Sequence, residues 1–313
     1  MLPRFHPALV CMGWLAASAA MAQTAPPERA AAPAASGGAG QQAFEFVQAY
    51  EAATPEVNQI PRWKDPLCVQ VIGVPPDQAA QVKGRVEDVA KAVGLSAAPA
   101  GCQANVEIIF AAQPQRIVDN FVKGREWILG YYSKDPGAKI VSRPIQAWYV
   151  TATTGCGGGN AGWTFAYTGV PSQASGNPAQ LNDKVMDQPG TWKPTGCGDS
   201  TLTSGLRNDI VNVFMVVDTS KAQGRSVGVL SDYAAMLVLS QPRALGACQP
   251  LPSVTNLFVD GCPGGVQDGL TAADASYLTA LYQANPEARA VNEQADIAGR
   301  MAKMLGAPGG IAR

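Results

Sequence analysis

Runs of apolar, β-branched residues alternate along the chain with stretches in which apolar residues recur about every 3.6 positions. The runs predict buried strands, and the periodic stretches predict amphipathic helices. The expected strands are residues 67–74, 105–111, 144–153 and 209–217. The expected helices begin with the pattern Ala43, Phe46, Val47, Tyr50, Ala53 and continue at 77–93, 113–122, 224–239, 270–282 and 286–305. This alternation favours an α/β (α+β) fold, with helices packed on a mixed sheet and a helical C-terminal part.

Short-range signals mark several of the expected helix ends. A proline pair ends the first strand, and Asp77 is placed to cap the helix that follows. Gly94 is placed to stop the same helix. Thr271 and Asp274 have nearly the spacing and chemistry of a capping box, which predicts a helix start at that point.

The beginning of the chain has the features of a secretory signal peptide in their usual order. Arg4 is followed by an apolar run at residues 8–20, too short to span a bilayer, and then by the small-residue cleavage site Ala20-Met21-Ala22. A buried N-terminal helix is the alternative, and Cys11 lies too early in the run for a lipoprotein. The expected divisions are a signal peptide at 1–22, a disordered Ala/Pro/Gly-rich tether at 23–41 and a single globular domain at 42–313. We expect no transmembrane segment in the mature chain.

Six cysteines remain after the expected cleavage, and an even number in an exported protein indicates disulfides. Their spacing favours the sequential pairs Cys68–Cys102, Cys156–Cys197 and Cys248–Cys262. Six cysteines allow 15 pairings, so other connectivities stay open. A zinc cluster is the alternative, but the chain has no CxxC pair. The signal and the cysteines together predict a periplasmic or secreted protein.

Charge and histidine content exclude several functions. The 313 residues include 23 Lys and Arg and 24 Asp and Glu, so loss of Arg4 leaves 22 basic against 24 acidic side chains. Such a charge balance gives no indication of a nucleic-acid partner or of an electrostatic membrane anchor. His6 is the single histidine and lies in the expected signal, so the mature chain lacks the base of a Ser–His–Asp or Cys–His site.

Residues 154–205 differ in composition from the rest of the domain. They are rich in Gly, Pro, Asn and Thr and contain several aromatic residues. We expect an irregular insertion pinned by its own disulfide, with a hairpin near 163–168. Since loops of this length are uncommon unless functional, Trp163 and Trp192 are candidate binding residues. An ornamented surface loop without a ligand is the alternative.

The order of segments in residues 209–283 resembles that of the zincin metallopeptidases. In those proteins a buried strand leads into a helix bearing HExxHxxGL, followed by a Ser-Ile-Met-like turn and a helix that ends in Leu-Tyr. Here VLSDYAAMLVL at 229–239, SVTNLF at 253–258 and LTAADASYLTALY at 270–282 stand in these places. The resemblance extends more loosely to the strands from residue 67 onward, and it implies a zincin-like mixed sheet.

The chain departs from the zincin pattern at the residues that perform the chemistry. Counting back from the helix end places Ser231 and Ala235 at the two histidine positions and Asp232 at the general-base position. Gln241 falls near the third ligand position, and Thr255 replaces the methionine of the turn. Zinc in such a site needs two imidazoles at i and i+4 on one helix face. The resemblance therefore implies a metal-free scaffold with Ser231, Asp232 and Ala235 as a pseudo-site, and we expect no metal and no cofactor.

Two functions remain open. The first is an exported, non-catalytic binding or envelope-assembly protein that holds an unknown protein or a cell-wall polymer. The second is a periplasmic hydrolase that uses a carboxylate pair, for which Glu107, Asp232 and Asp274 are available although no spacing selects two of them. Asp232, beside Tyr233, is either a carboxylate of perturbed pKa or an ordinary helix charge. A calcium site near Asp260 and Asp268 is possible, but the sequence there lacks the EF-hand-like alternation of ligands. The balance of these arguments favours a protein that is not an enzyme.

Overall fold

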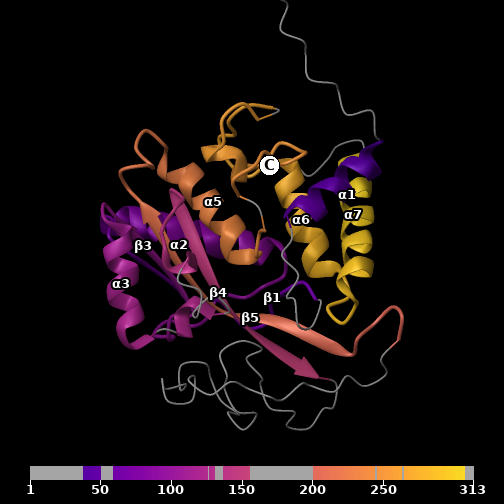
Figure 1. Ribbon diagram of the computed structural model, residues 1–313, viewed down its shortest axis with the longest axis horizontal. Helices are drawn as coiled ribbons and strands as arrows, with labels where there is room; N and C mark the ends of the chain where they lie inside the picture. The colour runs from indigo at the N-terminus through magenta and orange to yellow at the C-terminus, as the bar shows by residue number, and fades with distance from the viewer. Residues whose placement is uncertain are drawn as a thin grey trace, which may run out of the picture. The chain divides into compact units, whose positions relative to one another are not determined.

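One long central strand, β5 (Leu206–Asp218), organises the sheet in the computed structural model of the chain. The structure describes residues 38–50, 59–125, 127–130, 137–155, 200–243, 245–262 and 264–306, which all belong to one compact unit, Gly37–Arg313. On one side of β5 lie β3 (Val106–Ala111) and then β2 (Val69–Ile72), both parallel, and β4 (Ile145–Gly155) pairs antiparallel on the other. A two-residue strand, β1 (Arg62–Trp63), pairs in parallel with the first half of β5. The expected mixed sheet is therefore confirmed (Figure 1).

Both faces of the sheet are buried because successive strand residues point to opposite sides and are apolar on each. Ile108 of β3 faces the core that α2 (Pro76–Ala92) and α5 (Val227–Leu239) share. Its neighbour Ile109 faces a smaller cluster under α3 (Pro114–Arg125) on the other side. The expected α/β architecture is thus a sheet with helices on both faces.

Three further helices form a group of their own (Figure 1). α7 (Ala290–Gly306) packs against both α1 (Ala39–Tyr50) and α6 (Ala272–Gln283). The rings of Tyr50 and Tyr277 meet edge to face with centroids 4.9 Å apart, which joins α1 to α6. The expected helical C-terminal part is confirmed. The helix predicted from the pattern at 43–53 is α1, which packs against this part although it lies near the start of the domain in the sequence.

A buried ion pair attaches this helical group to the sheet. Arg62 of β1 pairs with Glu293 of α7, and both side chains are almost fully buried. Arg62 also donates to the carbonyl oxygens of Leu281 and Ala284 at the end of α6, the second at 3.1 Å. The backbone N–H of Ile60 donates to Glu293 at 3.3 Å. Removing one partner would leave the other charge buried and unpaired, so this contact fixes where α7 lies against β1.

The predicted strands and helices are present within the described ranges, with ends shifted by a few residues. The prediction that Asp77 caps α2 is wrong. Pro75 is the N-cap residue without a side-chain cap bond, Pro76 occupies the first turn, and Asp77 follows inside the helix. Proline suits a helix start because its φ is already helical and it lacks an N–H that would need a partner. The stop at Gly94 is confirmed by its φ of 92° and its bond to the Lys91 carbonyl at 3.0 Å.

Smaller features were found only in the structure. The strand β1 and the short 3-10 helix η2 (Gly137–Lys139) have no clear sequence pattern. The expected turn at 253–258 is a 3-10 helix, η4 (Val254–Phe258). α1 begins at Ala39, so the last residues of the predicted tether are helical. Within the described ranges no helix is both long enough and apolar enough to cross a bilayer.

Two of the three expected disulfides are present. Cys68–Cys102 ties the start of β2 to the segment before β3, and Cys248–Cys262 closes the loop after α5. The third expected pair, Cys156–Cys197, lies outside the described residues, as do Trp163, Trp192 and the expected hairpin.

Candidate functional site

The candidate site lies partly on α5, a helix that is buried along most of its length. Its N-cap, Ser226, accepts a hydrogen bond from the N–H of Val229 at 3.2 Å, which satisfies one of the free donors of the first turn. Residues 229–239 are all buried, against the sheet, α2, η4 and α6. A helix that is apolar on nearly every side is expected to be surrounded in this way. The few polar positions on α5 are therefore informative.

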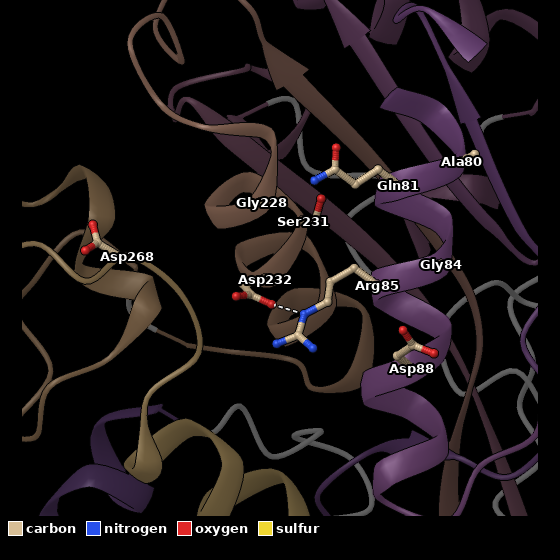
Figure 2. Close-up of a pocket in the computed structure, with 9 residues that line it drawn as sticks. All are labelled: Ala80, Gln81, Gly84, Arg85, Asp88, Gly228, Ser231, Asp232 and Asp268. Atoms are coloured by element: carbon tan, nitrogen blue, oxygen red, sulfur yellow. Dashed lines mark hydrogen bonds and ion pairs between the residues drawn. The ribbon is translucent and has the colours of Figure 1, made fainter. Parts of the chain in front are cut away.

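A groove of about 470 Å³ lies between the N-terminal half of α5 and the middle of α2 (Figure 2). Its volume falls in the range of small-ligand sites. The nine lining residues are Ala80, Gln81, Gly84, Arg85 and Asp88 on α2, Gly228, Ser231 and Asp232 on α5, and Asp268 on the loop before α6. Gly84 and Gly228 border open space: a Cβ on Gly84 would meet no atom within 4 Å, and one on Gly228 only the Ser226 hydroxyl at 3.8 Å.

Asp232 joins three segments that border the groove. Its Oδ1 accepts a hydrogen bond from Nε of Arg85 on α2, and its Oδ2 accepts one from the backbone N–H of Leu270 at 3.1 Å. Gly269 lies so close that a Cβ there would stand 2.5 Å from Oδ2. The Asp232 side chain is 11% exposed, whereas that of Arg85 is 43% exposed. Asp232 therefore acts as a clip between α2, α5 and the loop before α6.

Of the remaining polar residues without a charge partner in the groove, three are exposed and one is buried. Gln81, Asp88 and Asp268 are exposed, and Gln81 projects from α2 toward α5 (Figure 2). Ser231 is buried and donates its hydroxyl hydrogen to the carbonyl oxygen of Val227 at 2.6 Å. The groove thus has three carboxylates and one guanidinium. No three His, Cys, Asp or Glu side chains in the described part of the chain stand close enough together to hold a metal ion.

The structure places two of the three pseudo-site residues in the groove. Ser231 and Asp232 line it, whereas Ala235 is fully buried one turn later and is not part of the lining. The ring of Tyr233, the neighbour of Asp232, packs edge to face against the ring of Phe258. Burial raises the pKa of the Tyr233 hydroxyl well above its usual range. The tyrosine is therefore a core residue.

The sequence analysis missed the residues that α2 contributes. Gly84 and Arg85 follow Gln81 by three and four residues, and Asp88 follows them by four and three, which places all four on one face of a helix. This polar stripe with a glycine at its centre was the available signal. It could not be assigned to a site without knowing that the stripe faces α5.

Asp274 fixes η4 onto the start of α6. Its carboxylate accepts hydrogen bonds from the Ser253 hydroxyl at 2.5 Å and from the N–H of Val254 at 2.8 Å. It also completes the predicted capping box with Thr271, which is confirmed. Burial raises the pKa of Asp274, and the hydrogen bonds from Ser253, Thr271 and Val254 act in the opposite direction.

Two carboxylates of the sheet, Glu107, which was considered for catalysis, and Asp209, are each paired with an arginine. Glu107 on β3 pairs with Arg125 at the end of α3, with 3.2 Å between the charged atoms. Asp209 on β5 pairs with Arg207, and burial raises its pKa against the lowering effect of that arginine. Glu107 and Asp209 are not among the residues that line the groove.

Comparisons of the chain with protein-family models, with curated proteins and with solved structures find no match. The structure itself defines the class of fold, an α/β domain with a mixed sheet and two disulfides among the described residues.

Proposed function

We propose that the chain is an exported, non-catalytic binding or envelope-assembly protein that holds its partner in the groove between α2 and α5. The observation that carries the proposal is the engagement of Asp232. Both carboxylate oxygens already accept hydrogen bonds from the chain itself, from Arg85 and from Leu270. A general base must instead have an oxygen within reach of the proton that it removes. The carboxylate at the general-base position of the resemblance therefore has both oxygens engaged, and the groove offers a ligand a shaped polar surface.

A metal-free zincin-like scaffold is part of this proposal. The observed order is the buried strand β5, the helix α5, the short helix η4 and the helix α6, which agrees with the order of segments in zincins. Ser231 and Asp232, at the positions of a histidine and of the catalytic glutamate, border the groove. Without imidazole ligands such a scaffold retains a surface for binding and lacks the means to bind zinc.

Export to an oxidising compartment fits the two observed disulfides. Disulfides persist in the periplasm and outside the cell, and they are rare in the cytosol. Cys68–Cys102 and Cys248–Cys262 are closed within the compact unit, on opposite sides of α5 in the sequence. We propose a periplasmic or secreted location on this basis.

The alternative, a carboxylate-dependent hydrolase, has weaker support. Of the three carboxylates considered, Glu107 is paired with Arg125, Asp232 with Arg85, and Asp274 is enclosed by hydrogen bonds. They lie on β3, α5 and α6, and of the three only Asp232 borders the groove. A retaining or inverting pair would need two carboxyl groups facing one bond across a single site.

The test uses the mature chain and a defined panel of probes. The panel holds a soluble N-acetylglucosamine oligosaccharide and three synthetic decapeptides, one basic, one acidic and one neutral. Binding is followed by NMR chemical-shift changes. At least one probe should shift the resonances of α2 and α5, and Gly84→Trp should abolish the effect by filling the groove.

Gly299→Trp is the matched control, since Gly299 is an exposed glycine of α7 whose Cβ would also meet nothing within 4 Å. This variant should bind like the wild type. The proposal is overturned if no probe binds, if binding survives Gly84→Trp, or if the chain cleaves a probe and loses that activity in Asp232→Asn.

A further inference from the structure

We propose that the groove between α2 and α5 recognises a positively charged peptide segment through its lysine or arginine side chains. This inference rests on the proposed binding function of the same groove. Three carboxylates, Asp88, Asp232 and Asp268, border the groove, against the single guanidinium of Arg85. Because Arg85 is already paired with Asp232, the charges of Asp88 and Asp268 are left over. Neither forms an ion pair with any residue that the structure describes.

The charged residues next to the groove do not cancel this excess. Lys83 of α2 is paired with Glu87 one turn further along, at 2.5 Å. Arg225, just before α5, lies over the ring of Phe258 with 6.0 Å to the centroid. The N-terminus of α5 carries a partial positive charge, which the carboxylate of Asp232 in the second turn of the helix partly neutralises. The residues that line the groove therefore carry three negative charges and one positive charge.

The arrangement of the carboxylates favours an organic cation over a metal ion. They come from α2, α5 and the loop before α6, and the described residues contain no group of three donors close enough for a metal. A metal needs several oxygens within about 2.6 Å of one point. A lysine or arginine side chain needs one carboxylate for each charged end, so a peptide with several such side chains can use separated carboxylates.

The floor of the groove suits the long stem of such a side chain. Gly84 and Gly228 present helix backbone without a side chain, and Ala80 adds a single methyl group. The methylene groups of lysine and arginine pack on surfaces of this kind while the charged end reaches a polar partner. Arg85 itself shows the chemistry, because its guanidinium already lies in the groove against a carboxylate (Figure 2). None of the nine described residues that line the groove has an aromatic side chain to stack on a sugar ring.

The experiment measures binding of the basic, acidic and neutral decapeptides by isothermal titration to the mature chain. The basic peptide should bind, the neutral and acidic peptides should not, and affinity should fall as salt is raised. The double variant Asp88→Asn/Asp268→Asn should weaken binding of the basic peptide about fivefold, since each exposed ion pair contributes modestly. Both residues are exposed, so the variant should keep the circular dichroism and melting temperature of the wild type.

Asp77→Asn is the matched control, because Asp77 is an exposed acidic residue of α2 that does not line the groove. It removes one charge from the same helix and should leave the affinity unchanged. Equal weakening by Asp77→Asn would reduce the effect to net charge and overturn the inference. Binding of the neutral peptide, the acidic peptide or the oligosaccharide in place of the basic peptide, blocked by Gly84→Trp, would overturn the cationic ligand and leave the proposed binding function intact. Failure of every probe to bind would overturn both.

Discussion

Asp232 links separate segments of the fold through the two oxygens of its carboxylate. Its two oxygens hold Arg85 and the N–H of Leu270, so the carboxylate connects a helix on one side with a loop on the other. At 11% exposure its side chain is partly shielded, which strengthens the hydrogen bonds relative to a fully solvated pair. Since Arg85 is half exposed, the ion pair itself contributes less than the hydrogen bond to Leu270.

We predict that Asp232→Ala lowers the free energy of unfolding by about 1–3 kcal/mol, because the partly buried N–H of Leu270 loses its acceptor. Arg85→Ala should cost less, about 0.5–1 kcal/mol, because it removes only the ion pair and leaves Asp232 partly hydrated. Urea denaturation of both single variants and the double variant gives the coupling energy of the pair. A coupling energy of zero would show that Arg85 and Asp232 do not interact in solution.

Gly269 lies close to the carboxylate of Asp232, which leaves little room for a side chain. A Cβ at this position would lie 2.5 Å from Oδ2, so Gly269→Ala should destabilise the chain by about 1–3 kcal/mol. The cost should shrink in the double variant with Asp232→Ala, because the opposing oxygen is then absent. Thermal unfolding of the single and double variants measures the difference.

Gly84→Ala serves as the control for Gly269→Ala, since a Cβ on this helical glycine meets nothing within 4 Å. It should stabilise the chain by up to about 1 kcal/mol through helix propensity. Equal destabilisation by Gly269→Ala with and without Asp232 would refute the steric account.

At the scale of elements, α6 is held by its first turn. Thr271 and Asp274 form the capping box, and Asp274 also binds the start of η4 through Ser253 and the N–H of Val254. One carboxylate therefore sets both the start of a helix and the position of the preceding turn. This explains why a polar residue is fully buried at this point.

Thr271→Ala should lower the free energy of unfolding by about 1 kcal/mol, because the first turn of α6 loses its side-chain cap. Thr279→Ala, the same change later in α6, should be neutral or slightly stabilising because alanine is the better helix former. Urea titration of the two variants provides the measurement. A smaller loss from Thr271→Ala than from Thr279→Ala would contradict the role of the capping box.

Elements were predictable from sequence where periodicity is strong, and the groove was not. The apolar runs of β5 and α5 and the Thr271–Asp274 signal each depend on neighbouring residues, so a local reading finds them. The pair of Arg85 and Asp232 joins residues 147 positions apart, and only the packing of α2 on α5 brings them together. The start of α2 was misplaced because two candidate signals adjoin, and Pro76 decided the outcome ahead of Asp77.

Over the whole molecule, covalent and ionic links join parts that hydrophobic packing alone would hold less rigidly. One disulfide lies before α5 in the sequence and the other after it, with separations of 34 and 14 residues between the paired cysteines. The pair of Arg62 and Glu293 ties the helical group to β1. The Cys68–Cys102 bond closes the segment that contains α2, and Asp232 links α2, α5 and the loop before α6. The walls of the groove are therefore largely formed before a ligand arrives, which reduces the entropy cost of binding.

Stability of the whole molecule should depend on pH with opposite signs at two carboxylates of β5. Burial raises the pKa of Asp209 above 3.8, so the folded state keeps this proton at a pH where the unfolded chain has lost it. Asp209 therefore contributes stability below 3.8 that is lost as pH rises through the higher folded pKa. Asp209→Asn does not titrate, and it should gain stability relative to the wild type as pH rises from about 3 to about 7.

Asp218 gives the opposite expectation. Burial acts to raise its pKa, but hydrogen bonds from Ser220 and Lys221 outweigh burial and lower the pKa below 3.8. Its contribution is present above 3.8 and is lost as pH falls through the lower folded pKa, so Asp218→Asn should lose stability relative to the wild type as pH rises. Urea denaturation of both variants across pH separates the two cases, and Asp274 cancels because all three proteins retain it. Parallel curves for the two variants would show that burial at Asp209 and hydrogen bonding at Asp218 do not differ in the way that their contacts indicate.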